Sequence, residues 1–403
     1  MKALRSALDP PARRLLAAVE SAADALGTEA WAVGGAVRDI ALGRPINDLD
    51  VAVACDPGPF VGAVLAVLSD PGATSEVTDR FGTATVVAGG RQLDLARLRT
   101  EHYVAPGNLP VVRATARVEA DLERRDFTVN AVALGIGGAR RGELLDPFDG
   151  LGDLASRTLR VLHDRSFQDD ATRLYRGART AALFDLRPDA DTAALIAAGG
   201  RWLEPISGER LRAEWAYTAR RGRAGRAFAL LDVWGVLHAT HAPLHLTPAA
   251  RRALLRRPGP MPPELLAATV LAPLAAREGV LERLTAPREW RQAAEGAAML
   301  LAATDVTSER LERLSATTEA ARTAARWLDP RRQTPLQRDL RRWERTRPHL
   351  DAEALVHLGL PRGAALGAAL RGLRRARFLG TLGSAAEARA EIRRRLAGDE
   401  GWG

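Results

Sequence analysis

The sequence predicts a mixed α/β or α+β head followed by an all-α body and tail. Short hydrophobic runs at the two-residue period of strands are confined to the first 155 residues, where they are mixed with helical segments. From about Ser166 onward, alanine, leucine and arginine recur at helical spacing, with proline or glycine at the breaks. A chain of 403 residues is also too long for one compact core, so several modules are expected.

The elements of the head can be taken in order. Asp9 precedes Pro10 and Pro11, and proline suits the first turn of a helix, so a helix is expected to begin here. Hydrophobic alternation predicts strands over residues 31–33, 48–53, 83–87 and 92–97. In the remainder, prolines divide the chain into helices of ordinary length, and the proline cluster at 258–263 is expected to be a linker.

Two carboxylates lie two residues apart in the predicted strand 48–53. Asp48 and Asp50 alternate with Leu49, Val51 and Val53, so both carboxylates are expected on one face of the strand. Adjacent carboxylates repel each other unless a cation lies between them, and their oxygens suit Mg²⁺. Asp48 and Asp50 are therefore the candidate metal ligands. The alternative is an exposed strand with a solvated acidic edge.

A glycine pair precedes this strand. Gly34 and Gly35 allow backbone N–H groups to approach an anion, and the turn opens a predicted helix whose N-terminus favours negative charge. Arg38 lies in the same segment. A glycine pair or an Asp-x-Asp pattern alone is common in loops, but the two together in this order indicate a phosphate-binding site.

Five blocks of sequence carry a resemblance to a known family. They are the Gly-Gly and Asp-x-Asp segments within 32–53, Arg124–Ala131 (RRDFTVNA), Leu145–Gly150 (LDPFDG), Asp169–Arg173 (DDATR) and Ile206–Glu214 (ISGERLRAE). Together they resemble the class II tRNA nucleotidyltransferases and bacterial poly(A) polymerases, within the polymerase-β-like nucleotidyltransferases. The resemblance implies an α+β fold, with a polymerase-β-like head of a small mixed sheet and helices, then an all-α body and tail.

The resemblance also implies the activity. It is the template-independent addition of C, A or both to the 3′ end of tRNA from CTP or ATP, with release of pyrophosphate. Asp48 and Asp50 would be catalytic and bind Mg²⁺, and Asp94 is the candidate third carboxylate, which would orient or deprotonate the attacking hydroxyl. Asp94 is expected on the face opposite Leu93 and Leu95, and the alternative is an exposed aspartate on an edge strand.

The second block supplies candidate nucleotide-binding residues. Arg124 and Arg125 are expected to neutralise triphosphate charge, and Asp126 to accept hydrogen bonds from ribose hydroxyls. Asn130, four residues later, is expected on the same helical face and in contact with ribose or phosphate. The alternative for this block is a surface cluster of salt bridges.

The fourth block is expected to select the base. Asp170 and Arg173 are expected three residues apart on one helix face, where a carboxylate and a guanidinium complement the amino group and ring nitrogen of cytosine or adenine. The alternative is an ion pair between the two. Arg176 and Arg179 continue the stripe toward phosphates or the groove. Asp169 stands where the family often has glutamate, and its role is open.

Composition indicates the partner and the compartment. A net charge of +9, almost all from arginine, favours a polyanionic partner, although charge also serves solubility. The arginine-rich stretch 331–347 is expected to bind tRNA, or else to be a solvated helix face. The single Cys55 fits a reducing compartment, and neither a signal peptide nor a membrane-spanning run is evident, so a cytoplasmic protein is expected.

Four segments are expected along the chain. They are a nucleotidyltransferase head at 1–155, a helical neck with the nucleotide-selecting motif at 156–258, a helical body at 259–334 and a helical, Arg-rich tail at 335–403. The sequence leaves open whether the enzyme adds CCA, CC or A, and its oligomeric state. Other functions kept open are a poly(A) polymerase acting on other RNAs and a catalytically silent RNA-binding protein. His238, His241 and His245 are not expected to bind zinc, because Pro243 interrupts the helix between them.

Overall fold

The computed structural model describes residues 1–46, 49–78, 82–303 and 307–398. The chain divides into two compact units, Met1–Ala242 and Pro243–Gly403. The first unit contains the sheet and the second is built of helices, so the expected α+β fold is confirmed. The finer division into four segments remains a prediction.

The head is organised on one mixed sheet of seven strands. Their order is β3 (Thr74–Thr78), β4 (Thr83–Ala88), β5 (Arg91–Arg97), β2 (Leu49–Val53), β1 (Ala30–Val33), β8 (Ala133–Gly137) and β9 (Leu144–Leu145). Strands β2 and β5 are parallel, and the other neighbouring pairs are antiparallel. The four strands expected from hydrophobic alternation are all present in the described residues.

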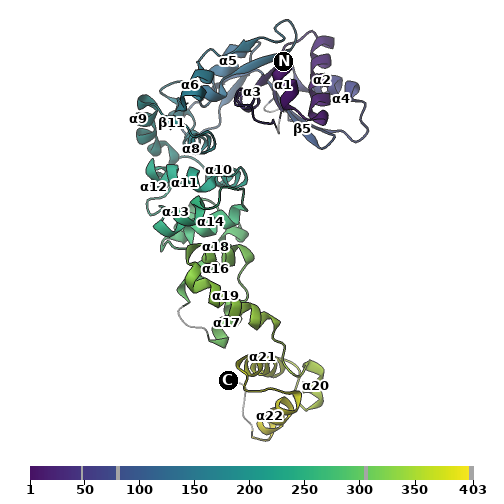
Figure 1. Ribbon diagram of the computed structural model, residues 1–403, viewed down its shortest axis with the longest axis vertical. Coiled ribbons are helices and arrows are strands. Elements are labelled where there is room, and N and C mark those ends of the chain that lie inside the picture. The colour runs from purple at the N-terminus through teal and green to yellow at the C-terminus, as the bar shows by residue number, and fades with distance from the viewer. Residues whose placement is uncertain (47–48, 79–81, 304–306, 399–403) are drawn as a thin grey trace. The chain divides into compact units, whose positions relative to one another are not determined.

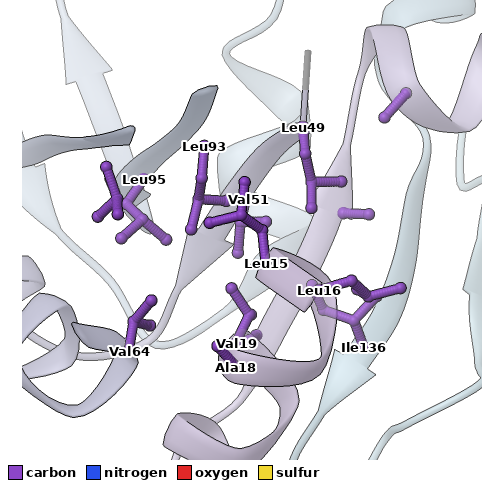
Figure 2. Packing of buried hydrophobic residues seen from close by; sticks show 14 of the residues in the cluster. Leu15, Leu16, Ala18, Val19, Leu49, Val51, Val64, Leu93, Leu95 and Ile136 are labelled. Carbon is purple, nitrogen blue, oxygen red and sulfur yellow. The ribbon is translucent and has the colours of Figure 1, made fainter. Parts of the chain in front are cut away.

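Helices cover one face of this sheet. They are α1 (Lys2–Ala7), α2 (Pro10–Ala25) and α4 (Pro57–Leu68), of which α2 and α4 lie side by side (Figure 1). Helix α2 begins as expected, with the Asp9 carboxylate accepting a hydrogen bond from the Ala12 N–H. Leu15 and Val19 of α2 face Val51 of β2 and Leu93 of β5 across a continuous apolar core (Figure 2).

The opposite face of the sheet carries the Asp50 side chain. Leu49 and Val51 belong to the core under α2, so their neighbour Asp50 points to the other side of the sheet. Ala52, two residues along, joins a second buried cluster with Trp31 on that other side. Short elements surround this face: α3 (Gly35–Ala41), α5 (Val118–Glu123), the turn η2 (Thr128–Asn130), α6 (Gly150–Ser156) and the hairpin β6 (Arg99–His102) and β7 (Val111–Ala114).

Helices complete the first unit. They are α7 (Ser166–Asp169), α8 (Arg173–Phe184), α9 (Ala190–Gly199), η3 (Gly200–Leu203), α10 (Gly208–Arg220), α11 (Ala224–Val233) and α12 (Val236–Thr240), with a short parallel pair β10 (Thr158–Leu159) and β11 (Arg187–Pro188). Trp215 is fully buried and meets Phe228 edge to face, with 4.6 Å between ring centroids. This packing fixes α10 against α11 and supports the arginines that α8 and α10 present.

The second unit contains helices and no strand among its described residues. Its helices are α13 (Pro248–Leu255), α14 (Pro263–Leu271), α15 (Arg277–Arg283), α16 (Arg288–Ala302), α17 (Ser308–Leu314), α18 (Glu319–Leu328), α19 (Pro330–Arg345), α20 (Ala352–His357), α21 (Ala364–Leu379) and α22 (Ala385–Ala397). The proline cluster follows α13 and ends at Pro263, the first residue of α14, inside this unit. In the described part of the chain, no helix is both long and apolar enough to cross a membrane.

One arginine of the basic stretch has a structural role. The Arg342 guanidinium lies 4.7 Å from the Phe378 ring centroid and donates a hydrogen bond of 2.9 Å to the Phe378 carbonyl near the end of α21. Arg374 of α21 donates in return to the Trp343 carbonyl, at 2.8 Å. Arg338, Arg341, Arg342 and Arg345 are all exposed. Arg342 differs in that it also contacts the end of α21.

Candidate active site

A cavity of about 930 Å³ in the first unit gathers the predicted site residues. Its walls come from β2, β5, α3, the β6–β7 hairpin, the segment after α5, and helices α8 and α10. The predicted residues that line it are Gly34, Gly35, Arg38, Asp50, Asp94, Arg124, Arg125, Asp126, Asn130, Asp170, Arg173, Arg176 and Arg179. Asp48 lies outside the described residues. Residues from sequence blocks more than 100 positions apart thus share one space.

Two carboxylates lie side by side in the wall of this cavity. Asp50 and Asp94 are register partners in the parallel pair β2 and β5, with both side chains on the face opposite α2. Asp94 accepts hydrogen bonds from the Thr85 hydroxyl at 2.8 Å and from the Gln92 amide at 3.0 Å. Strand β5 is flanked by β2 and β4, so Asp94 is not on an edge strand.

The donors of these residues suit a divalent cation. Carboxylate oxygens are the hard ligands that Mg²⁺ prefers, and Mg²⁺ commonly binds one or two carboxylates together with substrate phosphates. Among the described residues, no group of three or more His, Cys, Asp or Glu side chains could hold a metal ion. Asp50 and Asp94 therefore offer two hard oxygen donors, and their binding of a metal ion remains a prediction.

The glycine pair adopts the turn that the sequence predicts. Gly34 has φ = 62° and directly precedes α3, and a Cβ at this position would lie 2.8 Å from the Arg125 guanidinium. Arg38, one turn into α3, donates to the Asn130 side chain at 2.5 Å and lies 4.0 Å from the centroid of the Phe184 ring. The turn thus brings backbone and two guanidinium groups close together, which suits a polyphosphate.

A buried carboxylate holds both arginines of the second block. Asp121, 1% exposed, accepts from Arg124 at 2.8 Å and from Arg125 at 3.0 Å. Burial alone would raise the pKa of Asp121, but the two guanidinium groups outweigh it and lower that pKa. Arg124 also contacts Glu101 at 2.9 Å. The salt-bridge cluster considered as an alternative therefore exists, and it lines the cavity rather than the outer surface.

Asp126 and Asn130 meet, but not on a helix. Helix α5 ends at Glu123, and Asn130 closes the three-residue turn η2, so the expected common helical face was wrong. The Asn130 amide still donates to Asp126 at 3.0 Å, and Arg176 contacts the same carboxylate at 2.8 Å. Burial opposes ionisation of Asp126, yet Arg176 and Asn130 prevail and lower its pKa to about 2.

Asp170 and Arg173 also differ from the expected helix face. Helix α7 ends at Asp169, and Arg173 begins α8, so Asp170 lies in the break between two helices. The Asp170 carboxylate accepts from the Thr172 N–H at 3.1 Å and from Arg210 at 2.9 Å. Arg173, 4% exposed, donates to the Ser166 hydroxyl and to the Arg124 carbonyl, at 2.9 and 2.7 Å.

These contacts bear on the ion pair that was the alternative for Asp170 and Arg173. The ion pair proposed as an alternative is not the arrangement found, because each side chain is held by other partners. Both groups are anchored separately and both line the cavity. Their ability to read a base remains a prediction.

The wall of the cavity also contains residues that were not among the predicted site residues. Glu101 and Tyr103 come from the β6–β7 hairpin, with the Tyr103 hydroxyl donating to Glu101 at 3.1 Å. Tyr217 comes from α10, two helical turns after Arg210. This seven-residue spacing was the available signal, because it places both side chains on the same helix face.

The fold and this site define the head of the chain as a nucleotidyltransferase head of the poly(A) polymerase type. Residues 30–160 match the family described as the poly A polymerase head domain. The family resemblance expected from the sequence is thereby confirmed for the head, where three of the five blocks lie.

Curated relatives are similar to the first half of the chain. A CC-adding tRNA nucleotidyltransferase of Deinococcus radiodurans is 42% identical over 209 residues, which cover 52% of this chain and 54% of the relative. An A-adding tRNA nucleotidyltransferase of Halalkalibacterium halodurans is 42% identical over 167 residues, covering 41% of this chain and 38% of the relative. The chain therefore spans about half or less of the length of these relatives.

Solved structures are similar over nearly the whole chain. The apo form II of a CCA-adding enzyme aligns with a TM-score of 0.79 at 23% identity and covers 98% of both chains. The Thermotoga maritima CCA-adding enzyme complexed with tRNA aligns with a TM-score of 0.72 at 23% identity, covering 99% of this chain and 98% of that chain. This similarity establishes a shared fold for the helical part as well as the head.

Proposed function

We propose that the protein is a template-independent tRNA nucleotidyltransferase that adds C, A or both to the tRNA 3′ end from CTP or ATP, with release of pyrophosphate. The observation that carries this proposal is the single cavity in which Asp50 and Asp94 meet the predicted nucleotide-binding residues. The relatives named CC-adding, A-adding and CCA-adding tRNA nucleotidyltransferases support it. We further propose a cytoplasmic location, which suits a chain with one cysteine.

The carboxylates would carry the chemistry. Mg²⁺ held by Asp48 and Asp50 would stabilise charge on the attacking hydroxyl and on the departing pyrophosphate. Asp94, held in place by Thr85 and Gln92, would orient the terminal ribose hydroxyl for attack on the α-phosphate.

The cationic residues would hold the triphosphate. Arg38 and Arg125 flank the Gly34 turn, so their guanidinium groups can share the phosphate oxygens with the backbone N–H groups of that turn. Arg124 lies beside them and is oriented by Asp121 and Glu101. Because the buried Asp121 already positions Arg124 and Arg125, these two side chains would lose little conformational entropy when the nucleotide binds.

Asp170 and Arg173 would select the base. A carboxylate beside a guanidinium complements the amino donor and ring-nitrogen acceptor of cytosine and adenine, whereas uracil and guanine present the opposite order. Each mismatched polar contact in a desolvated site would cost on the order of 1–3 kcal/mol. Asp126, which accepts from both Asn130 and Arg176, would contact the ribose together with Asn130.

A poly(A) polymerase is the second candidate, since the same head serves both activities in the family. The test is pyrophosphate release from CTP or ATP with tRNA transcripts that end at the discriminator base or at CC, compared with unstructured RNAs of equal length. We expect release only with tRNA and its loss in Asp50→Asn. Equal release with both RNAs would favour the poly(A) polymerase, and no release with either would contradict the proposed function.

A further inference from the structure

Arg173 reaches the active-site cavity from a buried position. One terminal nitrogen of its guanidinium donates a hydrogen bond of 2.9 Å to the Ser166 hydroxyl, and the other donates one of 2.7 Å to the Arg124 carbonyl. A guanidinium has five N–H donors, so donors remain for a ligand after these two bonds. Of the two acceptors, only the Ser166 hydroxyl belongs to a side chain.

Ser166 contacts both residues of the proposed base-selecting pair. It is the first residue of α7, it is fully buried, and it is not among the residues that line the described cavity. Its hydroxyl accepts from Arg173, and its backbone carbonyl accepts a hydrogen bond of 3.2 Å from the Asp170 N–H, just after the end of α7. A residue outside the cavity wall thus holds two residues of that wall.

The direction of a guanidinium decides whether it can discriminate between bases. The group carries donors alone, and cytosine and adenine offer it a ring-nitrogen acceptor, whereas uracil and guanine offer a carbonyl oxygen beside a ring N–H. A guanidinium that is free to swing reaches the carbonyl oxygen and keeps a hydrogen bond with the wrong base. A fixed guanidinium leaves donor against donor, and this unpaired contact rejects UTP and GTP. Selection by Arg173 therefore depends on what anchors it.

We propose that Ser166 is a positioning residue for base selection, whose hydroxyl holds the Arg173 guanidinium in the direction that meets the ring nitrogen of cytosine or adenine. This inference rests on the proposed function, because it requires Arg173 to face the incoming base. A role in packing alone predicts an equal effect on all four nucleotides, since Ser166 does not line the described cavity. The positioning role predicts a change in the choice among them.

The direct test compares the full-length wild-type protein with Ser166→Ala and Ser166→Gly, which both remove the hydroxyl without adding an atom. The kcat/KM of each nucleoside triphosphate is measured on tRNA transcripts that end at the discriminator base, at C and at CC. In both variants the preference for CTP or ATP over UTP or GTP should fall by about 10- to 100-fold, as expected for one lost hydrogen bond to a buried charged group. Affinity for tRNA should not change.

A double substitution shows whether Ser166 acts through Arg173. In protein that already carries Arg173→Ala, the further change Ser166→Ala should cause no additional loss of preference, because the hydroxyl has no guanidinium left to hold. An additional loss equal to that in the wild-type background would overturn the inference.

Thr192→Val is the matched control for the loss of a buried hydroxyl. Thr192 is fully buried in the same unit, and its hydroxyl accepts from the Val161 N–H at 3.1 Å, outside the lining of the described cavity. This variant should lose stability in thermal unfolding and keep its nucleotide preference. An equal loss of preference in Thr192→Val would overturn the inference, as would wild-type preference in Ser166→Ala and Ser166→Gly. If the wild-type protein transfers no nucleotide to tRNA, the proposed function itself fails; if it selects CTP or ATP and the variants without the hydroxyl select equally well, that function stands.

Discussion

Asp50 of β2 is the direct register partner of Asp94 of β5, in the one parallel pair among the described strands of the large sheet. In a parallel pair the two side chains emerge on the same face, so the carboxylates lie together without any local sequence proximity. The two residues belong to different parts of the sequence, at positions 50 and 94. The catalytic proposal depends on this pairing.

The first prediction concerns the carboxylates. Asp50→Asn and Asp94→Asn should each lower kcat for nucleotide addition, on the order of 10²–10⁴-fold, because each loses a charge needed at the reacting oxygens. Binding of tRNA should persist. Thr85→Val removes one hydrogen bond to Asp94 and should have a smaller effect. Single-turnover addition rates check this, and turnover close to wild type in Asp50→Asn would remove its catalytic assignment.

The second prediction concerns Gly34. Gly34→Ala should destabilise the protein by about 1–3 kcal/mol, because φ = 62° is strained for alanine, and it should also raise the KM for nucleotide because the new Cβ meets Arg125. Gly43→Ala is the matched control, since Gly43 has φ = 64° with nothing within 4 Å of its Cβ position. It should lose stability without a change in KM. Equal KM values in the two variants would contradict a role for the turn in nucleotide binding.

The third prediction is a pH dependence. The pKa of Asp126 is lowered to about 2 from 3.8, so its charged form stabilises the folded state fully above about pH 4 and progressively less as pH falls toward 2. Asp126→Asn should therefore lose about 2 kcal/mol of unfolding free energy near neutral pH. Urea unfolding at several pH values measures the gap between the two proteins. A gap that stays constant down to pH 2 would show that the ionised carboxylate contributes no stability.

The fourth prediction separates two kinds of arginine in α19. Replacing the exposed Arg338, Arg341 and Arg345 with glutamine should weaken tRNA binding and flatten the slope of log affinity against log salt by up to about three. Arg342→Gln should instead lower stability, because it loses its contacts to Phe378. Filter binding at several salt concentrations and thermal unfolding distinguish these outcomes. An unchanged slope in the triple variant would mean that these three arginines only solvate the surface.

Patterns among neighbouring residues in the sequence predicted the strands of the head and the start of α2. Alternation located the strands, and Asp9 with two prolines located the start of α2, because these signals depend on neighbouring residues alone. The adjacency of Asp50 and Asp94 could not be derived in that way, since strand pairing is a long-range property.

The two wrong helix assignments have a common cause. The Asp170 carboxylate accepts the Thr172 N–H, and the Asp126 carboxylate accepts the Phe127 N–H. Aspartate side chains compete in this way with the backbone carbonyls of a helix, so the chain turns where helical spacing predicted continuity. The tertiary fold nevertheless brought both pairs of residues into the cavity.

The most direct test of the account uses four tRNA transcripts, ending at the discriminator base, at C, at CC and at CCA, each offered one nucleoside triphosphate at a time. We predict that CTP, ATP or both extend at least one of the first three transcripts by defined single additions, that UTP and GTP extend none, and that the CCA transcript is not extended. Arg173→Ala should reduce the preference for CTP and ATP over UTP and GTP. Extension with all four triphosphates by the wild-type protein, or with none, would contradict the account.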